Sequence, residues 1–564
     1  MLYIRFAPRD KQAVTKYSAF ISFSYDQFYV TKIKELPVRF YHGNTKEWEI
    51  PSNLVSLVQE IGAIRFLNEK PEEEIDVEVD PNEFKTKPLP HQIDGVKYGI
   101  LNNSWILGDQ QGLGKTKQMI DLAVWKKHHA GLKHCLIICG VNNLKYNWLE
   151  EIEKHSNETA CILGKRFVRP KQEPSFENRL EDLKQLPSEF FWITNIESLR
   201  CKQMPNKHYK SEIVDMINEH INNKELGLVI VDEIHKAKNP NSAQGRGLMK
   251  IKGCPRIGLS GTLLVNKPLD LFMPLAFIEA IKNNYYQFKL RYIVSDPWGH
   301  PIGFKNMAEL RDIINVNMLR RTKDLLDLPP KITENIYLEM SKEEENIYNE
   351  ILSKTIQECD LIKSPRDKLA SLVRLRQVCC HTGLVSSKVK KSSKFEKLRD
   401  ILEEAKENGE KVIVFSMFRE VISLALEEFK EYDPLHIWGQ MNQQEIMDQK
   451  NKFQNEPGFQ VLFGVVQAAG TGITLNEASI VVFLDLPWNK ATMEQAEDRA
   501  HRIGTKKTVV IIKLLMKDTI DEVMDKTVMK KAGMGEVLVD GKDPQLFREF
   551  LGAVFRMRGE GFLR

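Results

Sequence analysis

The sequence has no run of about 18 apolar residues, so no segment has the length and hydrophobicity of a transmembrane helix. Its first residues, MLYIRFAPRDK, carry charge too early to form the apolar region of a secretory signal peptide. Cysteine is scarce, at eight of 564 residues with no CxxC pair, and Cys379-Cys380-His381 lacks a second ligand pair at zinc spacing. We therefore expect reduced, structural thiols and a protein that is not secreted: cytoplasmic in a bacterium or a virus-infected host cell, or nuclear in a eukaryote.

The sequence also has little net charge. Lys and Arg total 81 and Asp and Glu total 77, which gives a formal charge of +4. Residues 1–40 hold seven basic and three acidic side chains, whereas residues 71–83 hold seven acidic side chains and no basic one. Any site for a polyanion must therefore be a local patch, because the chain as a whole supplies no strong field.

A chain of 564 residues is too long for one compact core, so we expect several domains. Residues 1–70 predict a small α+β module with strands over Ala19–Phe23, Gln27–Val30 and Arg39–Tyr41. The acidic stretch at 71–86 has too little hydrophobicity to pack and predicts a linker.

From residue 87 onward, short β-branched runs alternate with helical periodicity, which is typical of a parallel sheet covered on both faces. We predict an α/β fold with one such lobe over 87–330, a mostly helical connecting segment over 331–392, a second lobe over 393–535 and a tail over 536–564. The expected strands are SWILGD (104–109), HCLIIC (134–139), FFWIT (190–194), LGLVIVDE (226–233), RIGLS (256–260), KVIVFS (411–416), PLHIWG (434–439), QVLFGVV (460–466), SIVVFLD (479–485) and TVVIIKLLM (508–516).

A glycine-rich loop follows the first of these strands. In Gly112-Leu-Gly114-Lys115-Thr116 the glycines let backbone N–H groups approach phosphate oxygens, and the helix N-terminus that follows favours negative charge. At this spacing Lys115 would reach the β- and γ-phosphates and the Thr116 hydroxyl would hold Mg²⁺. Asp109 stands where the usual motif has its first glycine. The loop predicts a nucleotide site.

Two carboxylates end the strand at 226–233. Asp232 and Glu233 follow an apolar run, where unpaired charge would be costly to bury. We predict that Asp232 holds Mg²⁺ through water and that Glu233 orients or deprotonates the attacking water. The alternative is a strand end that is simply exposed to solvent.

A pair of arginines lies in QAEDRAHR (495–502). Arg499 and Arg502 are three residues apart, a spacing that would place both on one face of a helix. Two guanidinium groups there suit the γ-phosphate of ATP in its transition state. Taken alone, the pattern also fits a salt-bridged surface helix.

Together these motifs resemble the motor of helicase superfamily two, and specifically its Swi/Snf-type double-stranded DNA translocases. KPLPHQIDGV (87–96) resembles the glutamine motif, DQQGLGKT (109–116) resembles DEMGLGKT with its own initial Asp, and VDEIH (231–235) resembles DEAH. Further similar stretches are LIICGVNNLKYNW (136–148), ITNIESL (193–199), LSGTLLVN (259–266), MLRRTKDLLDLPPK (318–331), LVRLRQVCCHTGLV (372–385), KVIVFSMF (411–418), QAAGTGITL (467–475) and QAEDRAHRIG (495–504).

The resemblance implies two RecA-like lobes that close on ATP and Mg²⁺ and step along one strand of a DNA duplex. We expect contacts to phosphates rather than to bases, and therefore binding without sequence preference. The residues implied are Gln92, Gly112, Gly114, Lys115, Thr116 and Gln495 for the nucleotide, Asn142, Thr194, Thr471 and Gly472 for DNA, and Ser260 and Thr262 for coupling nucleotide state to lobe contact.

A narrower resemblance concerns the N-terminal module, where VTKIKELPVRFYHGNTKEWEIP (30–51) is similar to the HARP-type modules of annealing helicases. It implies recognition of DNA structure; the alternative is a folding cap on the first lobe. The expected function is an ATP-dependent translocase that remodels branched or forked double-stranded DNA, with a monomer as one option. A strand-separating helicase and a nucleotide-gated DNA-binding or protein-displacing switch of low turnover remain alternatives.

Overall fold

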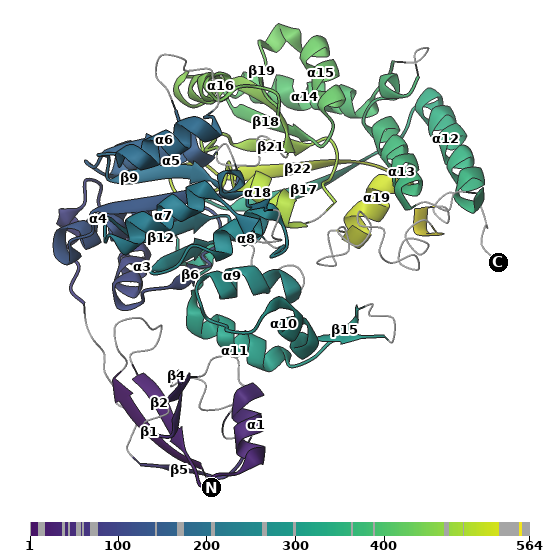
Figure 1. The fold of residues 1–564 in the computed structure, drawn as a ribbon. Coiled ribbons are helices and arrows are strands. Elements are labelled where there is room, and N and C mark those ends of the chain that lie inside the picture. Colours follow the sequence, from purple (N-terminus) through teal and green to yellow (C-terminus); the bar gives the residue numbers. More distant parts are fainter. Residues whose placement is uncertain are drawn as a thin grey trace. The chain divides into compact units, whose positions relative to one another are not determined.

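The chain forms two compact units, Met1–Leu325 and Leu326–Arg564, which are described one after the other (Figure 1). Among the described residues, no helix combines the length and the apolarity needed to cross a bilayer. The computed structural model describes residues 2–8, 17–35, 40–42, 45–51, 58, 61–67, 77–141, 144–165, 174–204, 209–237, 239–261, 268–296, 301–326, 328–361, 365–386, 390–466, 473–488, 490–528 and 552–554.

The N-terminal part of the first unit is a five-stranded sheet in the order β3-β4-β2-β1-β5 with one helix, α1 (Gln27–Glu35). The strand predicted over Gln27–Val30 is wrong. The Asp26 carboxylate accepts a hydrogen bond from the backbone N–H of Phe28 (2.8 Å), and the Asp26 carbonyl accepts one from Val30 (3.0 Å), so a helical turn starts here. The strands are β1 (Leu2–Pro8), β2 (Tyr17–Ser22), β3 (Phe40–His42), β4 (Glu47–Pro51) and β5 (Ile64–Phe66).

The rest of the first unit is built on a seven-stranded sheet in which every neighbouring pair is parallel, in the order β16-β6-β13-β12-β7-β9-β8. The five strands predicted for this lobe are all present, and the structure adds the short strands β8 and β16, of three and two residues, at the two edges of the sheet. The strands are β6 (Trp105–Leu107), β7 (His134–Cys139), β8 (Ala160–Ile162), β9 (Phe191–Asn195), β12 (Leu226–Asp232), β13 (Arg256–Leu259) and β16 (Met318–Leu319).

This sheet is buried on both faces. Leu136 and Ile138 of β7 pack into one hydrophobic cluster, and the alternating Cys135, Ile137 and Cys139 pack into another. Because side chains alternate across a strand, the two clusters lie on opposite faces of the sheet. The helices are α3 (Pro90–Leu101), α4 (Lys115–Ala130), α5 (Leu144–His155), α6 (Phe176–Gln185), α7 (Glu212–Asn222), α8 (Ala243–Met249), α9 (Phe272–Phe277), α10 (Tyr285–Tyr292) and α11 (Met307–Asn317).

The second unit contains a six-stranded parallel sheet in the order β17-β22-β21-β18-β20-β19. The five strands predicted for this lobe are present, and the structure adds β17, which pairs with β22 along its whole length at the edge of the sheet. The prediction of a mostly helical connecting segment is therefore wrong over residues 331–338. The strands are β17 (Lys331–Leu338), β18 (Lys411–Ser416), β19 (Leu435–Ile437), β20 (Gln460–Val465), β21 (Ile480–Phe483) and β22 (Val509–Met516).

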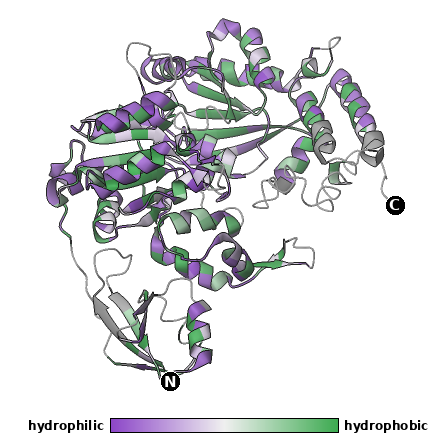
Figure 2. Ribbon diagram, in the orientation of Figure 1, coloured by the Kyte–Doolittle hydropathy of each residue, from purple (hydrophilic) through white to green (hydrophobic). Residues whose placement is uncertain are grey.

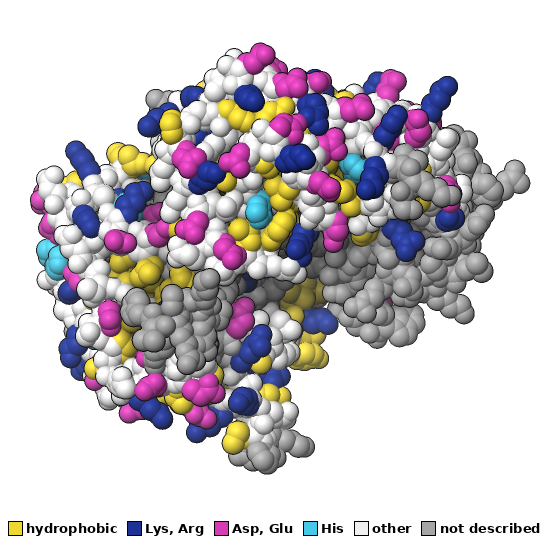
Figure 3. Space-filling view, turned by 90° about the horizontal axis from the view of Figure 1, so that it is seen from above, with side chains coloured by type: hydrophobic (Ala, Val, Ile, Leu, Met, Phe, Trp, Pro, Cys, Tyr) yellow, Lys and Arg dark blue, Asp and Glu magenta, His cyan; other side chains and the backbone are white. Residues whose placement is uncertain are grey.

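Helices surround this second sheet, and Figure 2 shows hydrophobic residues concentrated in the strands of both units. The described Lys, Arg, Asp and Glu side chains are interspersed on the face drawn in Figure 3. The two units together confirm the predicted α/β class with two parallel-sheet lobes. The helices of the second unit are α12 (Lys342–Leu361), α13 (Pro365–Cys380), α14 (Ser393–Glu407), α15 (Arg419–Glu428), α16 (Gln443–Asn455), α18 (Lys490–Glu497) and α19 (Ile520–Val523).

Candidate nucleotide site

The predicted site residues of the first unit gather at one edge of its sheet. Parallel strands place all their carboxyl ends on the same side, which is where open α/β sheets bind ligands. The glycine-rich loop follows β6, Asp232 is the last residue of β12, and Ser260 follows β13 directly. The fold therefore brings together motifs that are more than 100 residues apart in the chain.

The glycine-rich loop has the backbone shape of a phosphate cradle. Gly112 (φ 88°) and Gly114 (φ 74°) both adopt left-handed conformations that a residue with a side chain rarely takes. Gly114 is also the residue before the first turn of α4, and it offers no side chain to cap the free N–H groups of that turn. An exposed helix N-terminus of this kind favours a bound phosphate. The Lys115 ammonium lies back across the loop and donates to the Asp109 carbonyl (2.8 Å).

The two carboxylates at the end of β12 lie in different surroundings. Asp232 is buried, and its Oδ2 accepts a hydrogen bond from the Trp148 indole N–H (2.8 Å). Burial and the adjacent Glu233 carboxylate raise the pKa of Asp232, and the Trp148 hydrogen bond and the Lys115 charge oppose that rise. Glu233 adopts φ 51° and keeps 20% of its side chain exposed. Burial alone would raise the pKa of Glu233, but His235, with the charges of Lys115 and Lys236, holds it below its usual range.

His235 links this carboxylate to the next strand. Its Nδ1 lies 3.1 Å from Glu233 Oε2 and 2.9 Å from the hydroxyl of Ser260, which is buried. His235 belongs to the VDEIH motif, but this link could not be predicted, because nothing in the sequence shows that Ser260 lies beside it. Thr262, the other predicted coupling residue, lies outside the described residues.

These groups fit a magnesium nucleotide. Mg²⁺ takes hard oxygen donors, and the Thr116 hydroxyl at the start of α4 and the Asp232 carboxylate are donors of that kind. The charge of Lys115 lowers the pKa of both Asp232 and Glu233 and so favours the ionised form of each carboxylate. Lys115 starts α4 after the glycine-rich loop, and Asp232 and Glu233 stand at the carboxyl end of β12, at the same edge of the sheet. Their roles toward ATP and Mg²⁺ stay predictions.

Gln92 is buried in the first turn of α3 and already has hydrogen-bond partners. Its Oε1 accepts from the Leu89 backbone N–H (3.0 Å), and its Nε2 donates to the Leu113 carbonyl (3.4 Å). The second bond joins the glutamine motif to the glycine-rich loop. Adenine recognition by Gln92 stays a prediction.

In the second unit the two arginines do not share a helix face, contrary to our expectation. Helix α18 contains Gln495 but ends at Glu497, because the carbonyls of Ala496 and Glu497 accept hydrogen bonds three residues on and wind the chain into tight turns. The arginines are nevertheless brought to one place. Arg499 Nη1 donates to the Ile473 carbonyl (3.4 Å), and Arg502 Nη1 donates to the Thr474 hydroxyl (2.7 Å).

Of the four residues predicted to contact DNA, the structure describes Thr194. Thr194 is buried, and its hydroxyl lies 2.8 Å from that of Ser198. Asn142, Thr471 and Gly472 lie outside the described residues. The DNA-binding role of all four stays a prediction.

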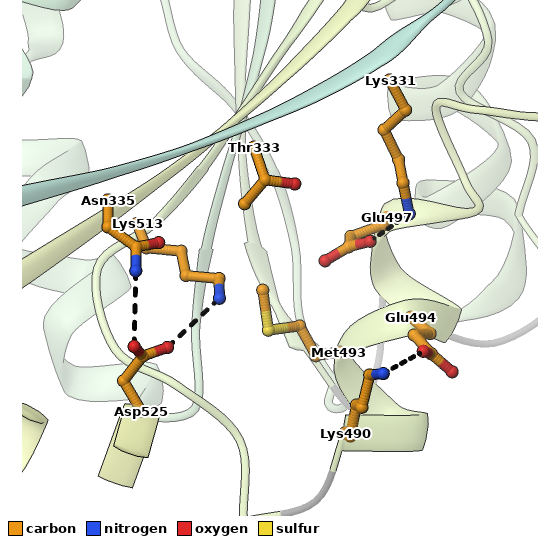
Figure 4. Close-up of a pocket in the computed structure, with 9 residues that line it drawn as sticks. All are labelled: Lys331, Thr333, Asn335, Lys490, Met493, Glu494, Glu497, Lys513 and Asp525. Atoms are coloured by element: carbon orange, nitrogen blue, oxygen red, sulfur yellow. Dashed lines mark hydrogen bonds and ion pairs between the residues drawn. The ribbon is translucent and has the colours of Figure 1, made fainter. Parts of the chain in front are cut away.

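A pocket of about 660 Å³ opens in the second unit beside α18 (Figure 4). Its charges are paired within it: Lys331 with Glu497 (2.7 Å), Lys513 with Asp525 (3.2 Å) and Lys490 with Glu494 (3.4 Å). None of its lining residues is among the predicted site residues. They are Lys331, Thr333, Asn335, Lys490, Met493, Glu494, Glu497, Lys513 and Asp525.

The fold and the site define an α/β protein with two parallel-sheet lobes and a glycine-rich loop that has the backbone shape of a phosphate cradle. Two protein families match the chain: the SNF2-related domain over residues 55–384 and the helicase conserved C-terminal domain over residues 393–504. The first match covers more than half of the chain, so the chain belongs to the SNF2-related family. The predicted membership of helicase superfamily two is confirmed.

The relatives are helicases of greater length. An uncharacterized ATP-dependent helicase of Mycoplasma pneumoniae is 31% identical over 445 residues, which cover 77% of this chain and 40% of the relative. The human DNA annealing helicase and endonuclease ZRANB3 is 27% identical over 490 residues, which cover 83% of this chain and 42% of the relative. The chain therefore spans about two fifths of the length of these relatives. Among solved structures, the Sulfolobus solfataricus SWI2/SNF2 ATPase core in complex with dsDNA is 26% identical, with 84% of this chain and 98% of that chain covered and a TM-score of 0.36.

Proposed function

We propose that this chain is an ATP-driven translocase on double-stranded DNA that remodels branched or forked DNA. The observation that carries the proposal is the placement of Lys115, Asp232 and Glu233 at one edge of the parallel sheet, beside the glycine-rich loop, in a chain that belongs to the SNF2-related family. The human relative is a DNA annealing helicase by name, which supports the choice of branched DNA.

The roles of the residues follow from their surroundings. Backbone N–H groups of the loop and the Lys115 ammonium bind the phosphates, and Thr116 and Asp232 hold Mg²⁺, which neutralises phosphate charge when bound. Glu233, ionised and partly exposed, orients the attacking water. Arg499 and Arg502 stabilise the charge of the transition state. DNA is held through its phosphates, so binding depends on salt and not on base sequence.

The test is the rate of ATP hydrolysis without nucleic acid and with single-stranded, plain duplex and forked DNA. We expect strong stimulation by duplex and the strongest by the fork. Stimulation by single strands alone would favour a strand-separating helicase, and weak turnover with tight DNA binding would favour a nucleotide-gated switch. Lys115→Ala should abolish nucleotide binding or turnover, whereas Glu233→Gln should bind ATP and not hydrolyse it. Normal turnover in either variant would refute the assignment.

A further inference from the structure

Residues 318–321, near the end of the first unit, run along the start of the glycine-rich loop. Strand β16 pairs in parallel with β6, and the hydrogen bonds continue past the strand. The backbone N–H of Gly108 donates to the Leu319 carbonyl (2.7 Å), and that of Gln110 donates to the Arg321 carbonyl (2.9 Å). A chain segment more than 200 residues downstream thus forms one wall of the loop that begins at Asp109.

Arg321 is the side chain that fastens this segment. Its guanidinium group is 12% exposed and forms a fork on the fully buried carboxylate of Asp109, with Nε donating to Oδ1 (3.0 Å) and Nη2 to Oδ2 (2.6 Å). Nη2 also donates to Gln118 Oε1 (2.7 Å), and Nη1 donates to the His91 carbonyl. A planar group with five fixed donors can serve all these acceptors at once, which an ammonium group cannot do.

The partners of Arg321 shape the nucleotide loop directly. Gln118 Nε2 donates to Asp109 Oδ2 (3.0 Å) and to the Leu113 carbonyl (3.4 Å), and His91 Nε2 lies 2.9 Å from that same carbonyl. Leu113 stands between the two left-handed glycines of the loop. The network has no spare room, since a Cβ at Gly95 would come within 1.9 Å of Gln118 Oε1. Loss of the Arg321 hydrogen bonds would therefore free Gln118 and His91, which hold the Leu113 carbonyl in the loop.

We propose that Arg321 is a positioning residue of the nucleotide site. It holds the loop between Asp109 and Gly114 in its phosphate-binding shape and joins that shape to the segment that leads to the second unit. The inference rests on the nucleotide binding of the proposed function and adds to it a residue outside the loop and outside the phosphate contacts. Removing one partner of a buried ion pair also destabilises the fold, so nucleotide affinity measured on folded variants is the quantity that reports the shape of the loop.

The segment that follows Arg321 forms further contacts at residues 329–331, within the second unit. The Pro329 carbonyl lies 2.8 Å from His501 Nε2, and Lys331 pairs with Glu497 (2.7 Å). Glu497 and His501 flank Arg499 in the sequence. Arg321 thus contacts the glycine-rich loop in the first unit, and Pro329 and Lys331 contact the turn that carries Arg499 in the second. The proposed function assigns both the loop and Arg499 to ATP.

The test is the dissociation constant of the fluorescent nucleotide mant-ADP with Mg²⁺, measured on the full chain well below its unfolding temperature. Arg321→Lys keeps the charge that Asp109 needs but loses the fork, and we expect it to weaken binding at least about tenfold. The matched control is Arg320→Lys at the adjacent, exposed arginine, which should bind within about twofold of the wild type. Thermal unfolding of each variant is recorded beside the titration.

A second variant keeps the inference testable if Arg321→Lys does not fold. Asp109→Asn retains the shape of the side chain and removes the charge that Arg321 grips, and it should also weaken mant-ADP binding. In the double variant the two losses should overlap rather than multiply, because both act through one contact. Wild-type affinity in the folded variants would overturn the inference alone. Failure of the wild type to bind mant-ADP would overturn the proposed function and this inference with it.

Discussion

The indole N–H of Trp148 donates a 2.8 Å hydrogen bond to Oδ2 of Asp232, joining helix α5 to the carboxylate that we assign to Mg²⁺. Both side chains are buried, so the bond lies in a low-dielectric setting where it supports the charged form of Asp232. Helix α5 starts directly after the segment that holds the predicted DNA contact Asn142. Trp148 thus connects helix α5 to the proposed ATP site.

We predict that Trp148→Phe raises the Mg²⁺ concentration needed for half-maximal ATP hydrolysis. Phenylalanine keeps most of the packing but cannot donate to Asp232, and a hydrogen bond to a charged group contributes roughly 1.5–3 kcal/mol, so a shift of about tenfold or more is expected. The Mg²⁺ dependence of mant-ADP binding should shift in the same direction. The control is Trp192→Phe, which removes an equally buried indole whose N–H donates to the Glu189 carbonyl (2.9 Å), away from the site. Equal Mg²⁺ dependence in the two variants would contradict the prediction.

Arg502→Ala should lower the maximal rate of ATP hydrolysis on the order of 10³-fold with mant-ADP affinity nearly unchanged. An arginine that meets the phosphate charge only in the transition state contributes to the rate and not to ground-state binding. Lys506→Ala is the control, since Lys506 is an exposed cation in the same turn region. A loss confined to nucleotide affinity would show that Arg502 is a binding residue instead.

Lys331→Gln should reduce the maximal rate several-fold and leave mant-ADP affinity unchanged. Its ammonium pairs with Glu497 at the end of α18, two residues before Arg499, so its loss frees the turn that carries the arginine. Burial would lower the pKa of Lys331, but the charge of Glu497 and its hydrogen bond raise that pKa above its usual value. Lys490→Gln breaks the exposed Lys490–Glu494 pair in the same pocket and should change neither quantity. Identical kinetics in the two variants would show that the Lys331–Glu497 pair does not position Arg499.

Arg376→Met should destabilise the second unit by about 3–5 kcal/mol in urea unfolding, because it leaves the Asp485 carboxylate buried without its partner. Arg376 Nη2 lies 3.0 Å from Asp485 Oδ2, and both side chains are at most 2% exposed. Arg399→Met, which removes an exposed pair with Glu428 and Glu431, should cost less than about 1 kcal/mol.

The same variant should respond to acid. Burial already raises the pKa of Asp485, and the Arg376 charge opposes that rise, so its loss raises the pKa further. A carboxyl with a raised pKa binds its proton more tightly in the folded state, so the stability of Arg376→Met relative to wild type should increase as the pH falls through that raised pKa. A stability difference that stays constant with pH would show that lost packing, not the uncompensated charge, causes the effect.

Much of the fold could be predicted from local pattern. The ten strands expected in the two sheets are all present, and HCLIIC and KVIVFS match β7 and β18 residue for residue, since a short β-branched run between turns has few other stable states. The errors have local causes. Gln27–Val30 is rich in aromatic and β-branched residues, as a strand would be, but the Asp26 cap and the burial of Ile33 make it a helix. Strand β17 is largely exposed, and its long pairing with β22 cannot be seen in its own sequence.

The sequence by itself determined the assignments that we propose: residue type and short spacing in DQQGLGKT and VDEIH predict which residues bind phosphate, hold Mg²⁺ and orient water. The tertiary structure decided which groups meet. Trp148 reaches Asp232 across 84 residues, and Arg321 reaches Asp109 across 212, because neighbouring parallel strands bring distant segments to one edge of a sheet. Contacts of that separation leave no periodicity in the chain, so the residues that hold the site in shape became visible only in the folded protein.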